Sequence, residues 1–346
     1  MHRRAFLISA AALTTPLVAG CQPKPSAADR PDPVFDQKAL QAQFQTLADR
    51  AAPGVLGVGV LDAQTGQTLA FNGDRRFPLQ SVFKAALGAG VLAQVDAGKL
   101  RLDETVSIRD IDLSPPFSPI ADAWPARTDY TLGELLERAC GASDNTAADV
   151  LLKRIDGPGA LTAWLVQEKI EDFRIDRYER QLQPEIMGMA SFRADWKGEA
   201  TYMPRMLAVP EAVRRASTAA YLADPRDTAT PVAAVRFLEA LRSGELLEPA
   251  STRRLLAIMT ATTTGQSRLK AALPAGAALA HKTGGARTDL GMTPASNDIG
   301  IITLADGRQY AVAVFLSGST APDAERDAII AQAGRIVLTI ALASKA

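Results

Sequence analysis

The spacing of apolar residues predicts two pairs of strands, one near each end of the chain. Residues 55–71 hold two apolar runs separated by a short polar turn, which is typical of a β-hairpin. Residues 299–316 hold two more runs, and the Asp306-Gly307 pair between them is a strong signal for a tight turn. Residues 324–343 follow with the period of an amphipathic helix. We therefore expect elements from both chain ends to combine in one layered α/β unit.

The middle of the chain has a different period and few strand signals. Residues 81–97 are apolar nearly all round and end at Gly98, which predicts a buried central helix. Residues 132–164 and 232–259 carry the 3.6-residue period of helices that pack on a core. This region is therefore predicted to be mainly helical.

The fold class that follows is a two-domain α/β protein. One domain is an antiparallel sheet flanked by helices from both chain ends, built from residues 35–80 and 263–346. The other is an all-α domain formed by residues 81–262. A chain of 346 residues, 47% of them hydrophobic, can bury such a core without disulfides or a structural metal.

The charge balance argues against partners that are recognised through a strong overall field. Lys and Arg total 38 and Asp and Glu total 38, so the formal net charge is zero. Nucleic acids and anionic membrane surfaces attract proteins with an excess of basic residues. We expect a monomeric globular enzyme that acts on a small molecule.

The amino terminus predicts export. The basic pair Arg3-Arg4 precedes an apolar run, residues 5–20, that is short for a membrane-spanning helix. Small residues then precede Cys21, the pattern at which bacterial lipoprotein precursors are cut and lipidated. Residues 1–21 are therefore predicted to be a lipoprotein signal peptide and residues 22–34 a flexible tether.

The expected location is the periplasmic or cell-surface side of a bacterial membrane, with the lipid as the only membrane contact. The Arg3-Arg4 pair also resembles a twin-arginine export signal. An uncleaved amino-terminal anchor helix is the alternative, and it places the enzyme on the same side of the membrane.

Cysteine and histidine are too scarce for several kinds of site. If Cys21 carries lipid, Cys140 has no partner for a disulfide, and its apolar helical surroundings favour a buried packing residue over a reactive thiol. His281 is the only histidine after the predicted signal peptide, which excludes zinc sites built on several histidines. A Ser-His-Asp triad would need His281, yet its neighbour Lys282 lies on the opposite face of a predicted strand. We expect no metal and no cofactor.

The first sequence that indicates chemistry is Ser81-Val82-Phe83-Lys84, at the start of the predicted central helix. Residues three apart lie on one face of a helix, so the Lys84 amine can approach the Ser81 hydroxyl. A helix amino terminus also stabilises a developing oxyanion. The alternative is a serine helix cap followed by a surface lysine, but a buried lysine needs a partner.

Two further tripeptides accompany this pair, Ser143-Asp144-Asn145 and Lys282-Thr283-Gly284. The three motifs in this order resemble those of class A serine β-lactamases and the related penicillin-binding proteins. The resemblance covers the chain from about Phe35 to the final helix. It implies that the active site lies between the two domains and that Ser81 opens a β-lactam ring.

The resemblance also implies a role for each residue in the motifs. Lys84 assists Ser81, Ser143 passes a proton to the departing lactam nitrogen, and Asp144 is structural. The remaining residues bind substrate. The Asn145 amide holds the carbonyl of the substrate side chain, and the backbone of Gly285 completes an oxyanion hole with that of Ser81. The substrate carboxylate meets Lys282, Thr283 and Arg268. For Arg268 a solvated surface arginine remains the alternative.

A fourth element comes from the resemblance alone. Glu179, in Asp176-Arg177-Tyr178-Glu179-Arg180, is similar to the general base of the family's Ω-loop. Such a carboxylate can deprotonate the water that hydrolyses the acyl-enzyme, a step that penicillin-binding proteins perform badly. Whether Lys84 or Glu179 is the base for acylation stays open, and an exposed glutamate is the alternative for Glu179.

The chain departs from the family in its Ω-loop region, residues 176–227. Gln183 stands where the family has an asparagine that helps to hold the hydrolytic water. Arg177 and Asp227 match the residues that close the loop by a salt bridge, but 43 residues separate Gln183 from Asp227. This segment, residues 184–226, is several times the usual length and is called the insertion below. It is apolar enough to pack as extra helix over the active-site rim.

Two other functions remain open. A penicillin-binding protein or D,D-peptidase would acylate and stall; Glu179 argues against it and the altered Ω-loop for it. A binding protein that kept the fold and lost catalysis would leave Ser81 and Lys84 merely packed.

Overall fold

The computed structural model of the chain describes residues 37–343. The predicted signal peptide with Cys21 and the tether, residues 22–34, lie outside the described residues. The described residues all belong to one compact unit. Between residues 37 and 343, no helix is both long enough and apolar enough to cross a membrane.

Nine strands and twelve α-helices are described within residues 37–343. The strands are β1 (Val55–Asp62), β2 (Thr68–Phe71), β3 (Phe77–Pro78), β4 (Thr105–Ser107), β5 (Asp129–Thr131), β6 (Thr228–Ala229), β7 (Ala278–Gly285), β8 (Thr293–Thr303) and β9 (Gln309–Ser319). The helices are α1 (Gln37–Ala51), α2 (Phe83–Asp96), α3 (Pro119–Ala123), α4 (Leu132–Cys140), α5 (Asn145–Arg154), α6 (Pro158–Gln167), α7 (Glu179–Ile186), α8 (Glu199–Leu207), α9 (Glu211–Ala223), α10 (Pro231–Ser243), α11 (Pro249–Thr260) and α12 (Asp323–Ala343). A 3-10 turn, η2 (Gln80–Val82), precedes α2.

The main sheet confirms the predicted union of both chain ends. Its order is β2-β1-β9-β8-β7, and every neighbouring pair is antiparallel. Both predicted hairpins are present, β1 with β2 and β8 with β9. Strand β8 begins at Thr293, six residues before the predicted start. The prediction missed these residues because Ser296, Asn297 and Asp298 are polar although they are buried. Such residues do not show the apolar pattern of a strand.

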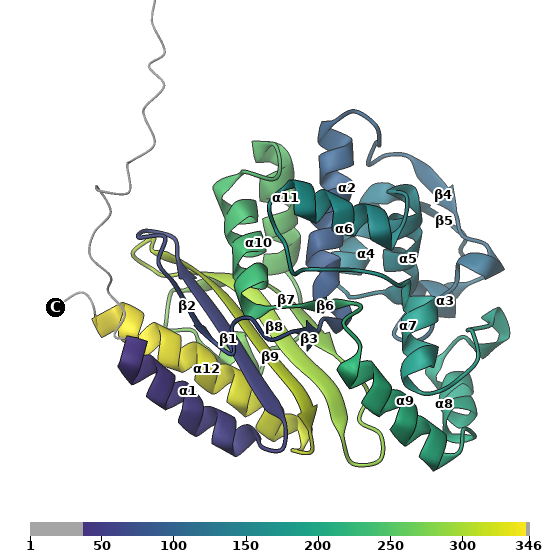
Figure 1. Cartoon of the computed structure of the whole chain (residues 1–346). Helices are drawn as coiled ribbons and strands as arrows, with labels where there is room; N and C mark the ends of the chain where they lie inside the picture. The colour runs from purple at the N-terminus through teal and green to yellow at the C-terminus, as the bar shows by residue number, and fades with distance from the viewer. Residues whose placement is uncertain (1–36, 344–346) are drawn as a thin grey trace, which may run out of the picture. The chain divides into compact units, whose positions relative to one another are not determined.

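Helices cover both faces of this sheet (Figure 1). On β9, Val312 and Val314 face the core under α1 and α12, while Ala313 and Phe315 face the core under α10 and the helical region. Gly59 allows α10 to lie close to the sheet, because a Cβ there would be 2.5 Å from the Pro231 carbonyl oxygen.

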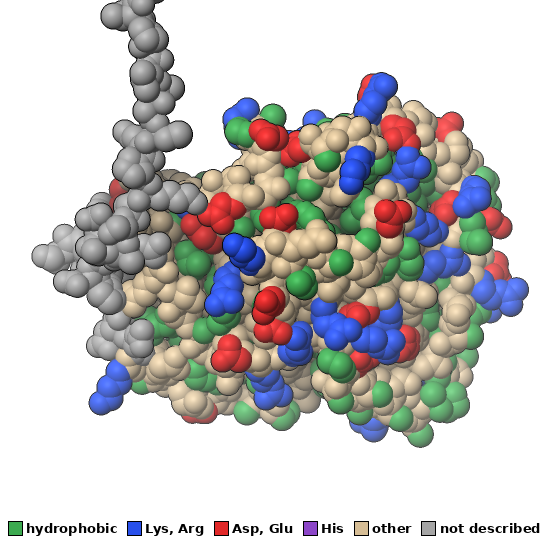
Figure 2. All heavy atoms as spheres, turned by 45° about the horizontal axis from the view of Figure 1, so that its top comes forward, with side chains coloured by type: hydrophobic (Ala, Val, Ile, Leu, Met, Phe, Trp, Pro, Cys, Tyr) green, Lys and Arg blue, Asp and Glu red, His purple; other side chains and the backbone are tan. Residues whose placement is uncertain are grey.

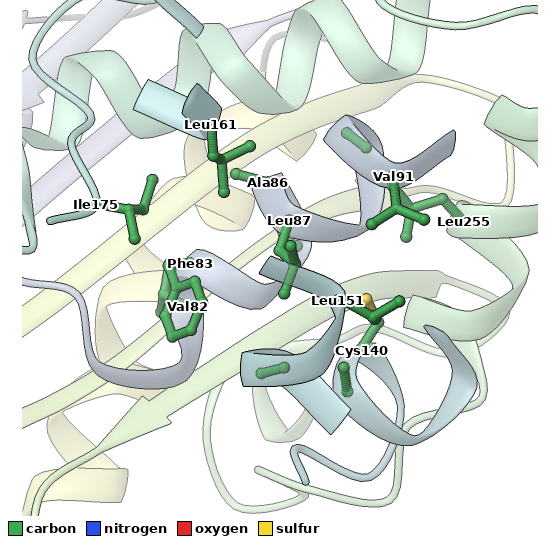
Figure 3. Close-up of a cluster of buried hydrophobic side chains, with 14 of the residues drawn as sticks. Val82, Phe83, Ala86, Leu87, Val91, Cys140, Leu151, Leu161, Ile175 and Leu255 are labelled. Atoms are coloured by element: carbon green, nitrogen blue, oxygen red, sulfur yellow. The ribbon is translucent and has the colours of Figure 1, made fainter. Parts of the chain in front are cut away.

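The helical region is built around α2, as the apolar sequence of residues 81–97 predicts. Helices α4, α5, α6 and α11 pack against it, and Figure 3 shows Leu87 and Val91 of α2 among side chains from these helices. Cys140 is fully buried beside Gly88, and burial raises the pKa of its thiol to about 12. Cys140 is thus the expected packing residue. The domain boundaries at residues 80 and 262 stay a prediction.

The insertion folds into helices, as expected. All of α8 and α9 and the last three residues of α7 lie in it, and Met187, Met206 and Tyr221 form a small buried cluster with Leu182 and Ile186. On the face drawn in Figure 2, basic and acidic side chains are interspersed.

Candidate functional site

Ser81 and Lys84 lie at the junction of η2 and α2, on one helical face. The Lys84 Nζ atom is 3.1 Å from the Ser81 Oγ atom. Lys84 is fully buried, whereas Ser81 is partly exposed and lines a cavity of about 550 Å³. The hydroxyl is therefore reachable from solvent while the amine beside it is not.

The Lys84 amine has four oxygen neighbours. It lies 2.8 Å from the Ser143 carbonyl oxygen, 2.6 Å from Asn145 Oδ1 and 3.0 Å from Glu179 Oε1, besides Ser81 Oγ. An ammonium group has only three protons to donate. The amine therefore lies where it can exchange a proton with the Ser81 hydroxyl on one side and with the Glu179 carboxylate on the other.

The Ser143-Asp144-Asn145 motif lies between α4 and α5. Ser143 has a φ of 65°, a left-handed conformation that is uncommon for a non-glycine residue and that occurs often at active sites. The Asp144 carboxylate accepts hydrogen bonds from the backbone of Ala147 and Ile120, so it caps α5 and fixes this turn. Its structural role agrees with the expectation.

The Lys282-Thr283-Gly284 motif lies near the end of edge strand β7. The Lys282 Nζ atom is 3.0 Å from Ser143 Oγ, and Thr283 Oγ1 is 2.8 Å from Thr264 Oγ1. Burial and then the positive charge of Lys84 lower the pKa of Lys282 to about 7. Gly284 permits the strand to touch η2, because a Cβ there would be 2.5 Å from the Leu79 carbonyl oxygen.

Glu179 opens helix α7, and its side chain is 1% exposed. Asp149 anchors this helix by accepting hydrogen bonds from the backbone of Glu179 (2.7 Å) and Arg180 (2.9 Å). Burial and the Glu179 carboxylate raise the pKa of Asp149 to about 6. The predicted salt bridge of Arg177 with Asp227 is present at 2.6 Å. These contacts fix the segment from Arg177 to the first turn of α7, and the Glu179 carboxylate faces the protein interior.

The structure brings most of the predicted residues together. Those that line the cavity are Ser81, Ser143, Asn145, Thr283 and Gly285, and Gln183 joins them. Lys84, Lys282 and Glu179 lie buried against these residues. Arg268 lines a neighbouring cavity, where it binds Asp327 at 2.7 Å and the carbonyl oxygens of Gly284 and Asn297. Its role in substrate binding stays a prediction.

Comparison with known proteins decides the family. The family model described as "Beta-lactamase enzyme family" matches residues 39–341. The extended-spectrum β-lactamase PER-1 of Pseudomonas aeruginosa is 32% identical over 80% of this chain and 79% of its own, and VEB-1 of the same organism is 29% identical over 81% and 83%. The chain belongs to the class A β-lactamase family. The structure of an ancestral class A enzyme of Gram-negative bacteria agrees, with a TM-score of 0.70 and 37% identity over 87% of this chain and 99% of its own.

The histidine alternative has no support in this class A β-lactamase. His281 is fully buried on β7, and its Nδ1 atom is 2.9 Å from Asp298. Its Nε2 atom has no hydrogen-bond partner among the described residues, Ser81 included. Within residues 37–343, no three potential metal-ligating side chains gather.

Several residues of this β-lactamase's site were missed from the sequence. Gln80 is hydrogen-bonded to Gln183 and to Tyr221 of the Ω-loop region, and Thr264 and Arg287 line the cavity. Gln80 is adjacent to the nucleophile, which was a usable signal. Tyr221 comes from the insertion, 141 residues from Gln80, and no sequence spacing indicates that contact.

Proposed function

We propose that this class A β-lactamase hydrolyses β-lactams through an acyl-enzyme on Ser81. The Ser81 oxygen attacks the lactam carbonyl carbon, and its proton passes to Lys84, or to Glu179 through a water. The ring C–N bond then breaks, and the nitrogen takes a proton delivered through Ser143. A backbone oxyanion hole at Ser81 and Gly285 supports the tetrahedral intermediate.

Hydrolysis of the ester restores the enzyme. Glu179 takes a proton from a water molecule, the water oxygen attacks the ester carbonyl carbon, and the proton returns to the Ser81 oxygen as the bond breaks. The product is the ring-opened acid. No metal or cofactor enters these steps.

Substrate binding uses the residues that surround the cavity. The carboxylate beside the β-lactam nitrogen meets the Lys282 ammonium and the Thr283 hydroxyl. The Asn145 amide holds the carbonyl of the substrate side chain. Arg268, which donates a hydrogen bond to the Gly284 carbonyl oxygen, adds positive charge to this carboxylate site.

One observation carries the proposal: the Lys84 amine lies within 3.1 Å of both the Ser81 hydroxyl and the Glu179 carboxylate. The test is steady-state hydrolysis of a penicillin, a cephalosporin and a carbapenem. We expect turnover by the wild type and its loss in Ser81→Ala. A single stoichiometric burst of a chromogenic cephalosporin, with no continued hydrolysis, would contradict the proposal.

That burst is the result expected for the second candidate, a penicillin-binding protein or D,D-peptidase. The altered Ω-loop, with Gln183 in place of asparagine, is what favours it. The inward-facing Glu179 carboxylate favours hydrolysis, because it supplies the base that a stalled acyl-enzyme lacks.

We also propose that the enzyme is exported and anchored by lipid on Cys21, and that it is monomeric. The support is the cleavage pattern before Cys21. The test is fractionation of cells that express the wild type or Cys21→Ala. The wild type should sediment with membranes and Cys21→Ala should not.

A further inference from the structure

Gln183, the residue that departs from the family's pattern, donates two hydrogen bonds through one nitrogen. Its Nε2 atom is 2.8 Å from Glu179 Oε2 and 3.0 Å from Gln80 Oε1. The other Glu179 oxygen faces Lys84 at 3.0 Å. Gln183 therefore fixes the rotation of the Glu179 carboxylate about its own axis.

The contact does not end at Gln80. The Gln80 Nε2 atom is 2.6 Å from the Tyr221 hydroxyl oxygen, so Glu179, Gln183, Gln80 and Tyr221 form one continuous chain of hydrogen bonds. An ionised carboxylate can only accept, which requires the Gln183 nitrogen to donate. The Gln80 oxygen must then accept, and the Gln80 nitrogen must donate to Tyr221. Glu179 thus sets the direction of the whole chain.

The two members farthest from Glu179 are buried, whereas Gln183 is partly exposed and lines the cavity. Gln80 is 2% exposed and Tyr221 is 4% exposed. Gln80 has a φ of 46°, a left-handed conformation that costs free energy in a glutamine, and its two hydrogen bonds offset that cost. Burial raises the pKa of Tyr221, which keeps its hydroxyl neutral.

Tyr221 belongs to the insertion. It packs on α9 against Leu182 and Ile186 of α7, in the small cluster that contains Met187 and Met206. The insertion therefore contributes to the catalytic site as well as to its rim. It supplies Tyr221, the hydrogen-bond acceptor at one end of the chain whose other end is Glu179.

We propose that Tyr221 is a positioning residue for Glu179 and acts through Gln80 and Gln183. This inference rests on the proposed function, in which Glu179 activates water. Without the hydroxyl, the buried Gln80 nitrogen loses its partner, and Gln80 and Gln183 can turn away from Glu179. The insertion then compensates for the missing asparagine of the Ω-loop.

The test compares Tyr221→Phe with the wild type, with the rate of acyl-enzyme hydrolysis followed by intact-protein mass spectrometry. We expect that rate to fall about tenfold, the loss expected for one buried hydrogen bond. Gln80→Met should produce a fall at least as large. In a Glu179→Gln background, Tyr221→Phe should have no further effect, because the group that it positions is gone.

Tyr202→Phe is the matched control. Tyr202 is also a buried tyrosine of the insertion, and its hydroxyl has no hydrogen-bond partner among the described residues. Its loss should leave the rate unchanged, and thermal melting should show all variants folded. An unchanged rate in Tyr221→Phe, or an equal fall in the Glu179→Gln background, overturns the inference while wild-type turnover keeps the proposed function. A wild type that never turns over overturns both.

Discussion

We expect the buried Lys282 ammonium to make substrate binding depend on pH. Its pKa is lowered to about 7 by burial and by the charge of Lys84, so the group loses its proton as the pH rises through neutrality. The substrate carboxylate then loses its cationic partner, and kcat/KM should fall by up to about tenfold per pH unit above pH 7. The measurement is a kcat/KM profile between about pH 6 and pH 9.

Two comparisons isolate Lys282 from other titrating groups. A substrate whose carboxylate is esterified should show a flatter profile, since it has no charge to pair. Lys282→Arg keeps a cation at every pH in this range and should also flatten the fall. A profile of the free acid that stays level would contradict the assignment.

The residues that were predicted from sequence are those that come in short motifs. Ser81 and Lys84 are three residues apart, and one helical turn brings them together. Glu179 required the resemblance, because a single glutamate among charged neighbours has no pattern of its own. Tyr221 could not be found, since its contact with Gln80 depends on how the insertion folds.

At the scale of elements, the segment before α7 depends on one buried arginine. The Arg177 guanidinium contacts Asp227 at 2.6 Å, Glu185 at 2.9 Å and Asp224 at 3.4 Å. Replacing Arg177 by methionine leaves the buried Asp227 carboxylate without its cation. We expect Arg177→Met to lower the free energy of unfolding by about 3 kcal/mol, measured by urea denaturation.

Arg174→Met is the control for that prediction. Arg174 pairs with Asp176 close by in the same loop, but its side chain is 39% exposed. Its loss should cost less than about 1 kcal/mol, because exposed ion pairs contribute little. Equal losses in the two variants would show that burial of Arg177 is not what stabilises the loop.

The spacing of apolar residues correctly predicted the helices and strands that are apolar on one face or all round. The central helix α2 and the two hairpins are of this kind. It failed for the first half of β8, where buried Asn297 donates hydrogen bonds to the carbonyl oxygens of Pro78 and Leu79. The buried side chains of a strand that faces a polar site can be polar when hydrogen bonds satisfy them, and the sequence of such a strand shows no hydrophobic alternation.

At the scale of the whole molecule, two ion pairs connect the insertion to the loop between β7 and β8. Glu199 of α8 pairs with Arg287, which lines the active-site cavity, and Arg214 of α9 pairs with Asp289 at 2.9 Å. The first pair is partly exposed, whereas Arg214 is 5% exposed. The buried pair is therefore expected to carry most of the coupling between the two segments.

Arg214→Met should loosen the insertion without unfolding the sheet. Besides Asp289, Arg214 donates hydrogen bonds to the carbonyl oxygens of Leu207 and Val209, so the variant leaves three acceptors unpaired. We expect amide hydrogen exchange in α8 and α9 to rise about tenfold or more, because local opening needs less free energy. Exchange in β8 and β9 should not change. Arg215→Met, at an exposed neighbouring position, should leave both regions as they are. A uniform rise across sheet and insertion would mean that Arg214 stabilises the whole molecule and not this connection.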